Sequence, residues 1–361
     1  MRLSSLGKST IVTTPDAFLN AESGDALFKH LTEASQRGND KVILDFRPVD
    51  HMNSAGASSL VKLTAMAKQD KVKLFAYGLN KRYHEILALT GLDEGITVLN
   101  GGCEKAALMP QAELAELEKM DFKAGKQSDA GWSPKLDRLR VTERPEGVFT
   151  KNMDGRRIIG QLHGFGQMWE KTYWLNMKKA GIKKEDVILA MQQHFVEFQP
   201  SENSFYLTSK GIAPGEMIFI DPRTPGGIVS TGVMVLYMDD NNLTFITPQG
   251  HPEAGWITFS VDEREDSVYV QIQGLVRASD PFFDLAFNIA GSKFQETIWK
   301  HVLSLLAKYL DVEDNVQMKK YSPSTDLQWS KSRNMLYNSQ LRSLPLNITS
   351  LFKRGHRIGK G

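Results

Sequence analysis

The residues whose types and spacing most suggest chemistry form the run Asn53-Ser54-Ala55-Gly56, at the start of a predicted helix. Asparagine is a favoured N-cap, and serine is tolerated at the first helical position. The unpaired backbone N–H groups and the positive end of the helix dipole favour an anion there. A phosphate on Ser54 would add about −1.5 to −2 charges at one point of the surface. The run therefore fits a phosphorylation switch, with a simple helix cap as the alternative.

Histidines in the C-terminal half give no catalytic or metal-binding pattern. They are scattered, without HExxH or another paired-ligand spacing, at His163, His194, His251, His301 and His356. The glycines form no Walker or dinucleotide fingerprint. In a predicted hairpin turn, His251 and Glu253 could pair with each other, and a catalytic role for them is the lesser alternative. We therefore expect no enzyme, no metal and no cofactor.

The composition is that of a folded globular protein. With 361 residues, of which 41% are hydrophobic and 24% charged, the chain is long enough for two or three domains. No run approaches the roughly 18 apolar residues needed to span a bilayer, and the N-terminus lacks a signal-peptide core. The single cysteine, Cys103, excludes an intrachain disulfide and fits a cytoplasmic location. A net charge of +2 is too small to imply a nucleic-acid partner for the whole chain.

Residues 1–102 alternate short apolar strands with amphipathic helices. Strands are predicted from residue 11 and over 41–46, 71–78 and 96–99, and helices over 25–38, 54–69 and 81–92. This order predicts an α/β sheet with helices packed on it.

The segment from 8 to 100 resembles a STAS domain, the fold of bacterial anti-sigma-factor antagonists. The resemblance is carried by a strand ending in Asp45, by Asn53-Ser54-Ala55-Gly56 at a helix start, and by Gly91-Leu92 near the end. It implies that Ser54 is the phosphorylation site and that Asn53, Asp45 and Gly56 complete the partner-docking surface. Asn53 stands where the best-known members have aspartate. A scaffold that docks without phosphorylation is the alternative, and Ser58 and Ser59 are interpreted as solvent-side residues.

Residues 103–132 are predicted to be a helical connector or linker, helix-prone after Pro110 and then rich in Gly, Ser and Pro.

The pattern of residues 133–312 predicts an α+β domain. A helix is predicted over 166–182 and another over 294–309. Between them lie predicted strands over 195–199, 204–209, 216–221, 232–239, 242–248, 256–263 and 267–279. A curved antiparallel sheet closed by a long C-terminal helix is the helix-grip plan.

This second domain is similar to an uncharacterised family of the START-like (SRPBCC) helix-grip superfamily, most clearly over 244–280. The string ITPQGHPEAGWITFSV (246–261) matches the family's GHPE hairpin, with Gln249 and Trp256 as departures. The resemblance implies an apolar ligand between the sheet and the long helix, with Arg277 among the polar groups that could meet it. A packed core is the alternative. The aromatic candidates for lining the cavity are Phe195, Phe198, Tyr206, Phe219, Tyr237, Phe245, Phe259, Tyr269, Phe283, Phe287 and Trp299.

Residues 313–361 are predicted to be a basic, mostly irregular tail. From Asp314 to the end, nine lysines and arginines against two aspartates give a net charge of +7. The tail could be a solvated extension, a contact to an anionic membrane surface, or an arm that docks a nucleic acid or a protein.

Together these features predict a cytoplasmic bacterial regulatory or adaptor protein. The STAS module would dock a protein partner, such as an anti-sigma factor or another kinase-like regulator, with Ser54 phosphorylation as its switch. The START-like module would bind an apolar ligand or a partner. The alternative is a lipid-handling or membrane-associated scaffold that uses the cavity as carrier and the basic tail as a peripheral membrane tether.

Overall fold

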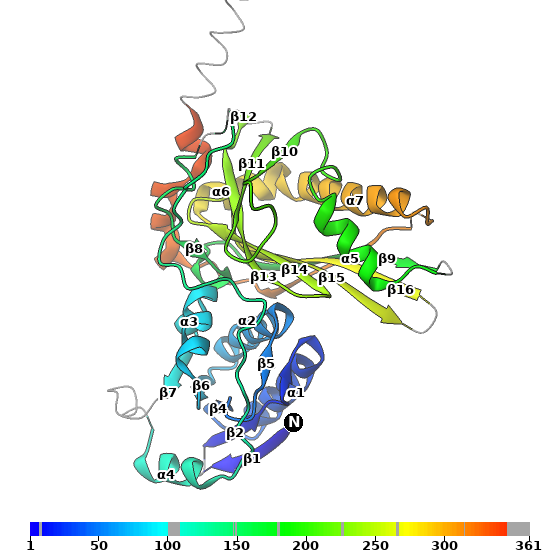
Figure 1. Cartoon of the computed structure of the whole chain (residues 1–361). Helices are drawn as coiled ribbons and strands as arrows, with labels where there is room; N and C mark the ends of the chain where they lie inside the picture. The colour runs from blue at the N-terminus through cyan, green and yellow to red at the C-terminus, as the bar shows by residue number, and fades with distance from the viewer. Residues whose placement is uncertain are drawn as a thin grey trace, which may run out of the picture. The chain divides into compact units, whose positions relative to one another are not determined.

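The computed structural model forms two compact units, Met1–Lys135 and Leu136–Gly361 (Figure 1). The residues described are 1–6, 9–99, 109–146, 148, 150–178, 181–224, 227–264, 267–313 and 315–344. Of residues 222–224, 227, 228, 290–292 and 294, only the backbone is described.

The N-terminal unit is built on a five-stranded sheet in the order β1-β2-β4-β6-β7. Its strands are β1 (Arg2–Leu6), β2 (Thr10–Thr14), β4 (Lys41–Asp45), β6 (Lys73–Tyr77) and β7 (Ile96–Leu99). Only β1 runs antiparallel to its neighbour; β2, β4, β6 and β7 are parallel. Two short strands, β3 (Phe18–Leu19) and β5 (His51–Met52), pair separately. The predicted α/β fold is confirmed for this unit, although β1 was not predicted.

Helices cover this sheet and contact one another. They are α1 (Ala21–Gln36), α2 (Ser54–Gln69), α3 (Lys81–Thr90), the short η1 (Leu92–Glu94) and α4 (Gln111–Lys119). A Cβ atom on Gly24 of α1 would lie 2.1 Å from the Ser59 hydroxyl, so α1 and α2 approach closely there. Ser58 and Ser59 are each only 3% exposed, and the prediction that they face solvent was wrong.

The connector belongs to the N-terminal unit. Leu117 of α4 is buried against alternate sheet residues, including Val12, Ile43 and Phe75. These residues share one sheet face because side chains alternate along a strand. The residues that follow α4 run along the loops of the same unit, as described below.

The C-terminal unit contains a large antiparallel sheet in the order β10-β11-β13-β14-β15-β16-β9-β17. Two short strands lie off this path, β8 beside β14 and β12 beside β11. The strands are β8 (Ile158–Ile159), β9 (Met168–Met177), β10 (Asn203–Leu207), β11 (Met217–Thr224), β12 (Gly227–Ile228), β13 (Thr231–Met238), β14 (Asn242–Pro248), β15 (Glu253–Arg264), β16 (Ser267–Ala278) and β17 (Gln317–Ser324). The helical segments are η3 (Gln161–His163), α5 (Lys184–Gln193), α6 (Pro281–Ala286), the π-helical η4 (Phe287–Gly291), α7 (Ser292–Tyr309) and η5 (Trp329–Tyr337).

Two elements differ from the sequence prediction. The segment predicted as a helix over 166–182 contains β9, which pairs with β16 from Trp169 to Met177. Every second side chain, at Tyr173, Leu175 and Met177, faces the core. This two-residue periodicity is that of a β-strand, not of a helix. The segment 195–199, predicted as a strand, is a turn that follows α5. Phe195 and Phe198 still reach the core from this turn.

The tail was predicted to be irregular, but it is ordered through residue 344. Strand β17 pairs with β9 at the edge of the sheet, and residues 339–344 are helical. Lys319 and Lys320 lie on this edge strand, where charged residues discourage pairing with other chains. Residues 345–361, with the most C-terminal basic cluster, lie outside the described residues.

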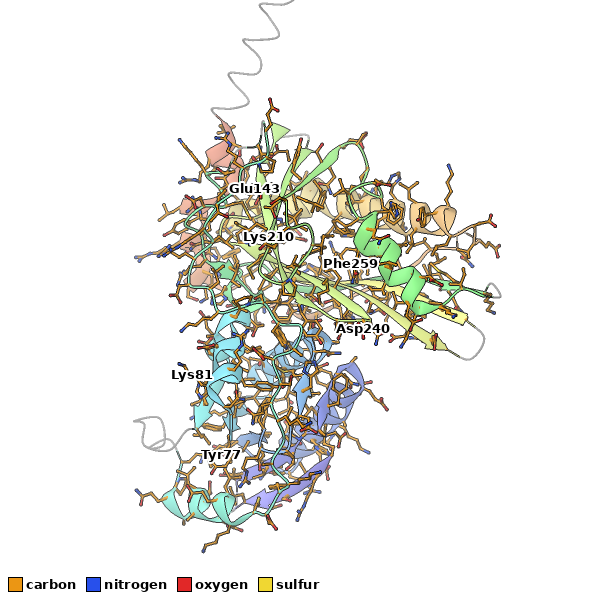
Figure 2. The ribbon with its side chains drawn as sticks, viewed as in Figure 1. Tyr77, Lys81, Glu143, Lys210, Asp240 and Phe259 are labelled. Atoms are coloured by element: carbon orange, nitrogen blue, oxygen red, sulfur yellow. The ribbon has the colours of Figure 1, made fainter. Side chains whose placement is uncertain are left out.

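One face of the large sheet carries the core of this unit. Helix α7 buries Ile298, Val302 and Leu306 against strand residues, and α5 packs on the same core (Figure 1). Phe259 of β15 is part of this core (Figure 2). Among the helices of the described chain, none is both long and apolar enough to cross a membrane.

Candidate functional site

The start of α2 brings together three of the residues that the sequence singled out. Asn53 is the N-cap, and its Oδ1 atom accepts a hydrogen bond from the Gly56 backbone N–H at 2.9 Å. Ser54 is the first helical residue, and its side chain is buried. A Cβ atom at position 56 would lie 2.2 Å from the Leu19 carbonyl oxygen, so only glycine fits there. The first turn of α2 is therefore fixed by a cap and by a close backbone contact.

Asp45 has an internal role. It is fully buried and accepts hydrogen bonds from Arg47 Nη2 at 2.7 Å and from Arg47 Nε at 3.0 Å. These bonds raise the pKa of the Arg47 guanidinium above its ordinary value. They also hold it over the rings of Tyr77 and Phe122, each 5.0 Å away. Asp45 thus orders this end of the sheet through contacts within its own unit.

An extended segment, residues 125–132, follows the loop that leads into α2. We call this segment the edge strap. Its backbone N–H groups at Gly125, Gln127 and Ser128 donate to the carbonyl oxygens of residues 47, 49 and 50, at 2.7, 3.0 and 2.7 Å. At its end, Trp132 Nε1 donates to the Met52 carbonyl oxygen at 2.7 Å. The strap therefore reaches the residue directly before the N-cap.

Gln127 fixes the middle of the edge strap. Its Nε2 atom donates to the carbonyl oxygens of Phe46 at 3.1 Å and Gly78 at 2.7 Å, and its Oε1 atom accepts from the Asn80 N–H at 2.7 Å. The residue is buried and has a φ of 46°, which is unfavourable for a non-glycine residue. Three hydrogen bonds to two loops offset this strain. In the structure the strap is an ordered part of the N-terminal unit and not a flexible linker.

The C-terminal unit contains a cavity of about 710 Å³. Its walls come from the sheet, from α6, η4 and α7, and from residues 340–344. Apolar side chains dominate the lining, and several of them are also exposed to solvent: Phe282, Ile289, Leu341 and Leu344. These exposed residues mark an apolar opening beside the π-helical turn η4. Such turns are frequent at functional sites.

Gly274 leaves room in the cavity wall. It lies within β16 and lines the cavity. A Cβ atom built on it would meet only the Lys171 carbonyl oxygen, at 4.0 Å. Glycine within a strand weakens the strand and often marks close approach by a ligand or another backbone. No neighbouring atom in the described chain requires glycine here, so the space in front of it belongs to the cavity.

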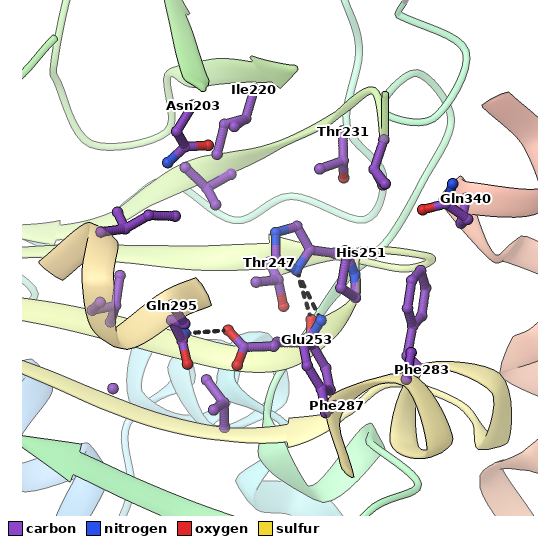
Figure 3. A pocket seen from close by; sticks show the side chains of 18 of the residues that line it. Asn203, Ile220, Thr231, Thr247, His251, Glu253, Phe283, Phe287, Gln295 and Gln340 are labelled. Carbon is purple, nitrogen blue, oxygen red and sulfur yellow. Dashed lines mark hydrogen bonds between the residues drawn. The ribbon is translucent and has the colours of Figure 1, made fainter. Parts of the chain in front are cut away.

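A polar cluster interrupts the apolar wall (Figure 3). Glu253 Oε2 accepts a hydrogen bond from Gln295 Nε2 at 2.8 Å, and Gln295 Oε1 accepts one from Lys171 Nζ at 2.6 Å. His251 Nδ1 lies 3.0 Å from both the backbone N and the backbone O of Glu253. If Nδ1 accepts the Glu253 N–H, the ring proton is on Nε2; if Nδ1 donates to the Glu253 carbonyl oxygen, Nε2 is an acceptor.

Burial shifts both titratable groups of this cluster toward their neutral forms. It raises the pKa of the Glu253 carboxyl, while the Lys171 charge and the Gln295 hydrogen bond oppose the shift. It lowers the pKa of His251 to about 4, so the imidazole is neutral at physiological pH.

Two further polar atoms in the wall have no partner among the described residues. They are Thr231 Oγ1 and Trp299 Nε1, both inaccessible to solvent. An unpaired buried polar atom costs about 1–3 kcal/mol. Because neither atom has accessible surface, a ligand in the cavity could reach it only after its side chain reorients.

The structure places some of the predicted aromatic residues around the cavity and others elsewhere. Phe195, Phe245, Phe283, Phe287 and Trp299 line it. Those absent from its lining are Phe198, Tyr206, Phe219, Tyr237, Phe259 and Tyr269. Phe198 and Phe259 are packed in the core beside it, so the packed-core alternative holds for them.

The remaining misplaced candidates are explained by strand register and by internal contacts. Phe219 lies between Ile218 and Ile220, which face the core, so it faces the other side of the sheet. Its cross-strand partner Tyr206 shares that face. Tyr237 donates its hydroxyl to Asp239 at 2.6 Å, and Tyr269 lies under the Arg264 guanidinium.

Arg277 also does not meet the cavity. It is 3% exposed and donates to the carbonyl oxygens of Gly166 at 2.6 Å and Asp326 at 2.7 Å. The prediction that it is a polar cavity group was therefore wrong. Its guanidinium instead ties the segment after β17 to the loop before β9.

The described residues contain no group of three or more His, Cys, Asp or Glu side chains that could hold a metal ion. His194 and Glu197 bond at 2.9 Å across one turn after α5, outside the cavity. Sequence reasoning missed Thr231, Gly274 and Gln295 as cavity residues, and Lys171 as the partner of Gln295. The one local signal among them is Gly274, which interrupts an otherwise alternating apolar strand.

Comparison with known proteins identifies part of the chain. Residues 8–101 match the family model described as STAS domain. No curated protein matches the sequence.

Several solved structures resemble part of the chain at low identity. Unphosphorylated SpoIIAA, an anti-sigma factor antagonist, is 12% identical over 33% of this chain and 98% of its own, with a TM-score of 0.25. The di-domain ARO/CYC protein StfQ from the steffimycin biosynthetic pathway is 9% identical over 40% of this chain, which spans 51% of StfQ, with a TM-score of 0.32. Major latex-like protein 151 from Panax ginseng is 14% identical over 37% of this chain and 97% of its own, with a TM-score of 0.26.

The family match agrees with the parallel strands, the capped start of α2 and the helix order of the N-terminal unit. Residues 8–101 of the chain are therefore a STAS domain.

Proposed function

We propose that the chain is a regulatory adaptor. Its STAS domain docks a protein partner, and its C-terminal unit is a START-like helix-grip domain that binds an apolar small molecule. The proposal assigns binding and no catalysis to the cavity. Its two halves rest on different observations, the family match for docking and the cavity for ligand binding.

The observation that carries the ligand-binding half is the cavity of about 710 Å³ with its apolar lining. Ligand pockets measure about 300–1,000 Å³ and are mostly apolar with a few placed polar groups. Protein interiors otherwise contain few voids larger than a water molecule. Gly274 supports this half because a larger side chain could occupy the space without a clash at Cβ.

The helix-grip assignment is supported by the way α7 packs. Its apolar stripe, with Ile298, Val302 and Leu303, lies against strands of the antiparallel sheet. Ile298 and Trp299, in the N-terminal half of the helix, belong to this packing and also line the cavity. A long helix that packs on the sheet and lines a cavity is the arrangement expected for ligand binding between helix and sheet.

The docking half centres on the start of α2. Asn53 supplies the cap, and a phosphate on Ser54 would lie at the positive end of the helix dipole. Ser54 is buried, so its phosphorylation requires this edge to open first. Because Trp132 bonds to Met52, release of the edge strap is part of the opening that we propose.

Binding of the uncharged fluorescent probe phenylnaphthylamine to the full chain tests the ligand-binding half. The test variant is Gly274→Leu, which places a side chain into the cavity. The matched control is Gln273→Leu on the adjacent position of β16, whose side chain is on the opposite sheet face. We expect the wild type and the control to bind alike, and Gly274→Leu to bind at least about tenfold more weakly. Equal binding by the wild type and Gly274→Leu would remove the cavity as the site.

The docking half is tested with Ser54→Asp and Ser54→Ala in quantitative pull-downs from the native lysate. If Ser54 is a switch, the two variants recover different amounts of the same partner, because only aspartate adds charge at the helix start. If the surface docks without a switch, both recover that partner equally, and the phosphorylation part of the proposal fails. Circular dichroism of each variant checks that the α/β fold is retained.

A further inference from the structure

We infer that the cavity selects an uncharged ligand with a hydroxyl group on an apolar body, over anionic and cationic amphiphiles of the same length. This inference rests on the proposed ligand-binding function and names the chemistry of the ligand. It is carried by the Glu253–Gln295–Lys171 cluster and by the position of His251 beside it.

The wall offers no charge to balance an anionic ligand. Among the described residues that line the cavity, there is no lysine or arginine, and Glu253 is the only carboxyl. Lys171 reaches the cluster only through Gln295, to which its Nζ atom is bonded at 2.6 Å. The Lys171 charge is already offset by Glu253, so a ligand carboxylate would be buried near another carboxyl without a balancing charge, which is strongly unfavourable.

A cationic ligand would also be buried without a balancing charge. The Glu253 carboxyl already accepts from Gln295, whose other end is bonded to the Lys171 ammonium. The Lys171 charge therefore already offsets that of Glu253 and would repel a ligand ammonium.

A hydroxyl group complements the wall because it both accepts and donates. It can therefore bond to His251 Nε2 whichever ring nitrogen carries the proton, and it can donate to Glu253. Thr231 Oγ1 could bond a second oxygen on the ligand once its side chain turns toward the cavity. In Figure 3, Thr231 lies across the cavity from His251 and Glu253, so the polar groups are at separate points of an apolar chamber. This arrangement fits an apolar body that carries its oxygen at one end or at both ends.

Competition against bound phenylnaphthylamine tests the inference with ligands that share one alkyl chain: decanol, decanoate, decylamine and decyl methyl ether. At about pH 8 the acid is ionised and the amine is protonated. The ether is uncharged but cannot donate a hydrogen bond, so it separates the hydroxyl from mere neutrality. We expect decanol to displace the probe at a concentration about tenfold lower than each of the other three.

The variant Glu253→Gln keeps the size of the side chain and removes its charge. We expect it to improve decanoate binding about fivefold or more relative to decanol. The matched control is Glu263→Gln, on the same strand but exposed and outside the cavity lining, which should leave every ratio unchanged.

The outcomes separate the inference from the function on which it rests. If wild type does not bind phenylnaphthylamine, or no alkyl ligand displaces it, the proposed ligand-binding function fails. If the probe is displaced but decanoate, decylamine or the ether competes as well as decanol, the cavity still binds apolar molecules and the hydroxyl selectivity is overturned.

Discussion

His251 makes the stability of the C-terminal unit depend on pH in a defined direction. Burial lowers its pKa from the ordinary 6.5 to about 4. As the pH falls through this range, the unfolded chain takes up a proton that the folded unit does not. The free energy of unfolding therefore falls as the pH is lowered, and the stabilisation is fully present only above the unfolded pKa.

The linkage relation gives the size of the effect. Between about pH 7 and about pH 5, a shift of this size removes about 2 kcal/mol, and at still lower pH the loss approaches about 3 kcal/mol. His251→Asn removes the titrating ring, while the Asn oxygen can still accept the Glu253 N–H in place of Nδ1. The wild type should therefore lose about 2 kcal/mol more than this variant over the same interval.

Glu253 changes the stability of the unit with pH in the opposite direction, so its contribution must be removed from the comparison. Its raised pKa means that the folded unit takes up that proton before the unfolded chain does, so its protonation adds stability as the pH falls. Both proteins are therefore compared in a Glu253→Gln background. Urea unfolding followed by tryptophan fluorescence is the assay, since every tryptophan except Trp132 lies in the C-terminal unit.

An equal pH dependence of stability in the two proteins would refute the reasoning. If the proteins with His251 and with Asn at that position lose the same free energy of unfolding to within about 0.5 kcal/mol, His251 is not held neutral by burial. A larger loss in the Asn variant would contradict the sign of the argument as well as its size.

Three further substitutions test other parts of the account. Gly125→Ala places a Cβ atom 2.2 Å from the Val49 carbonyl oxygen, so hydrogen exchange over the edge strap should accelerate at least about tenfold, while the exposed control Lys126→Ala should leave it unchanged. Gly56→Ala should lower the stability of the N-terminal unit by at least about 2 kcal/mol in chemical unfolding, because the first turn of α2 cannot approach Leu19. Arg277→Met should lower the stability of the C-terminal unit by about 2–4 kcal/mol and expose the segment around Asp326 to proteolysis, because two buried carbonyl oxygens lose their donor.

Much of the N-terminal unit could be predicted because each of its elements carries its own local signal. The strand at 41–45 is a short apolar run, and Asn53 caps the helix that follows it. Strand β1 was missed because its polar sequence, RLSSL, becomes a strand only by pairing with β2. The Gly- and Ser-rich composition of the connector gave no sign that Gln127 would bond to two loops that are 47 and more residues away.

In the C-terminal unit, local patterns predicted which residues are apolar but not which of them share a face of the sheet. The register of β13 shifts at a bulge between Val235 and Tyr237, which no local pattern reveals. The polar cluster depends on contacts such as the one between Lys171 and Gln295, which are 124 residues apart in the sequence. Such pairs become visible only when the sheet and α7 are assembled.

A crystal structure of the full chain grown with decanol would test the central claim most directly. We predict electron density for the alkyl chain inside the cavity beside Gly274, with its oxygen within hydrogen-bond distance of His251, Glu253 or Thr231. Density for the alcohol only on the outer surface, with the cavity closed by side chains or filled with water, would contradict the account.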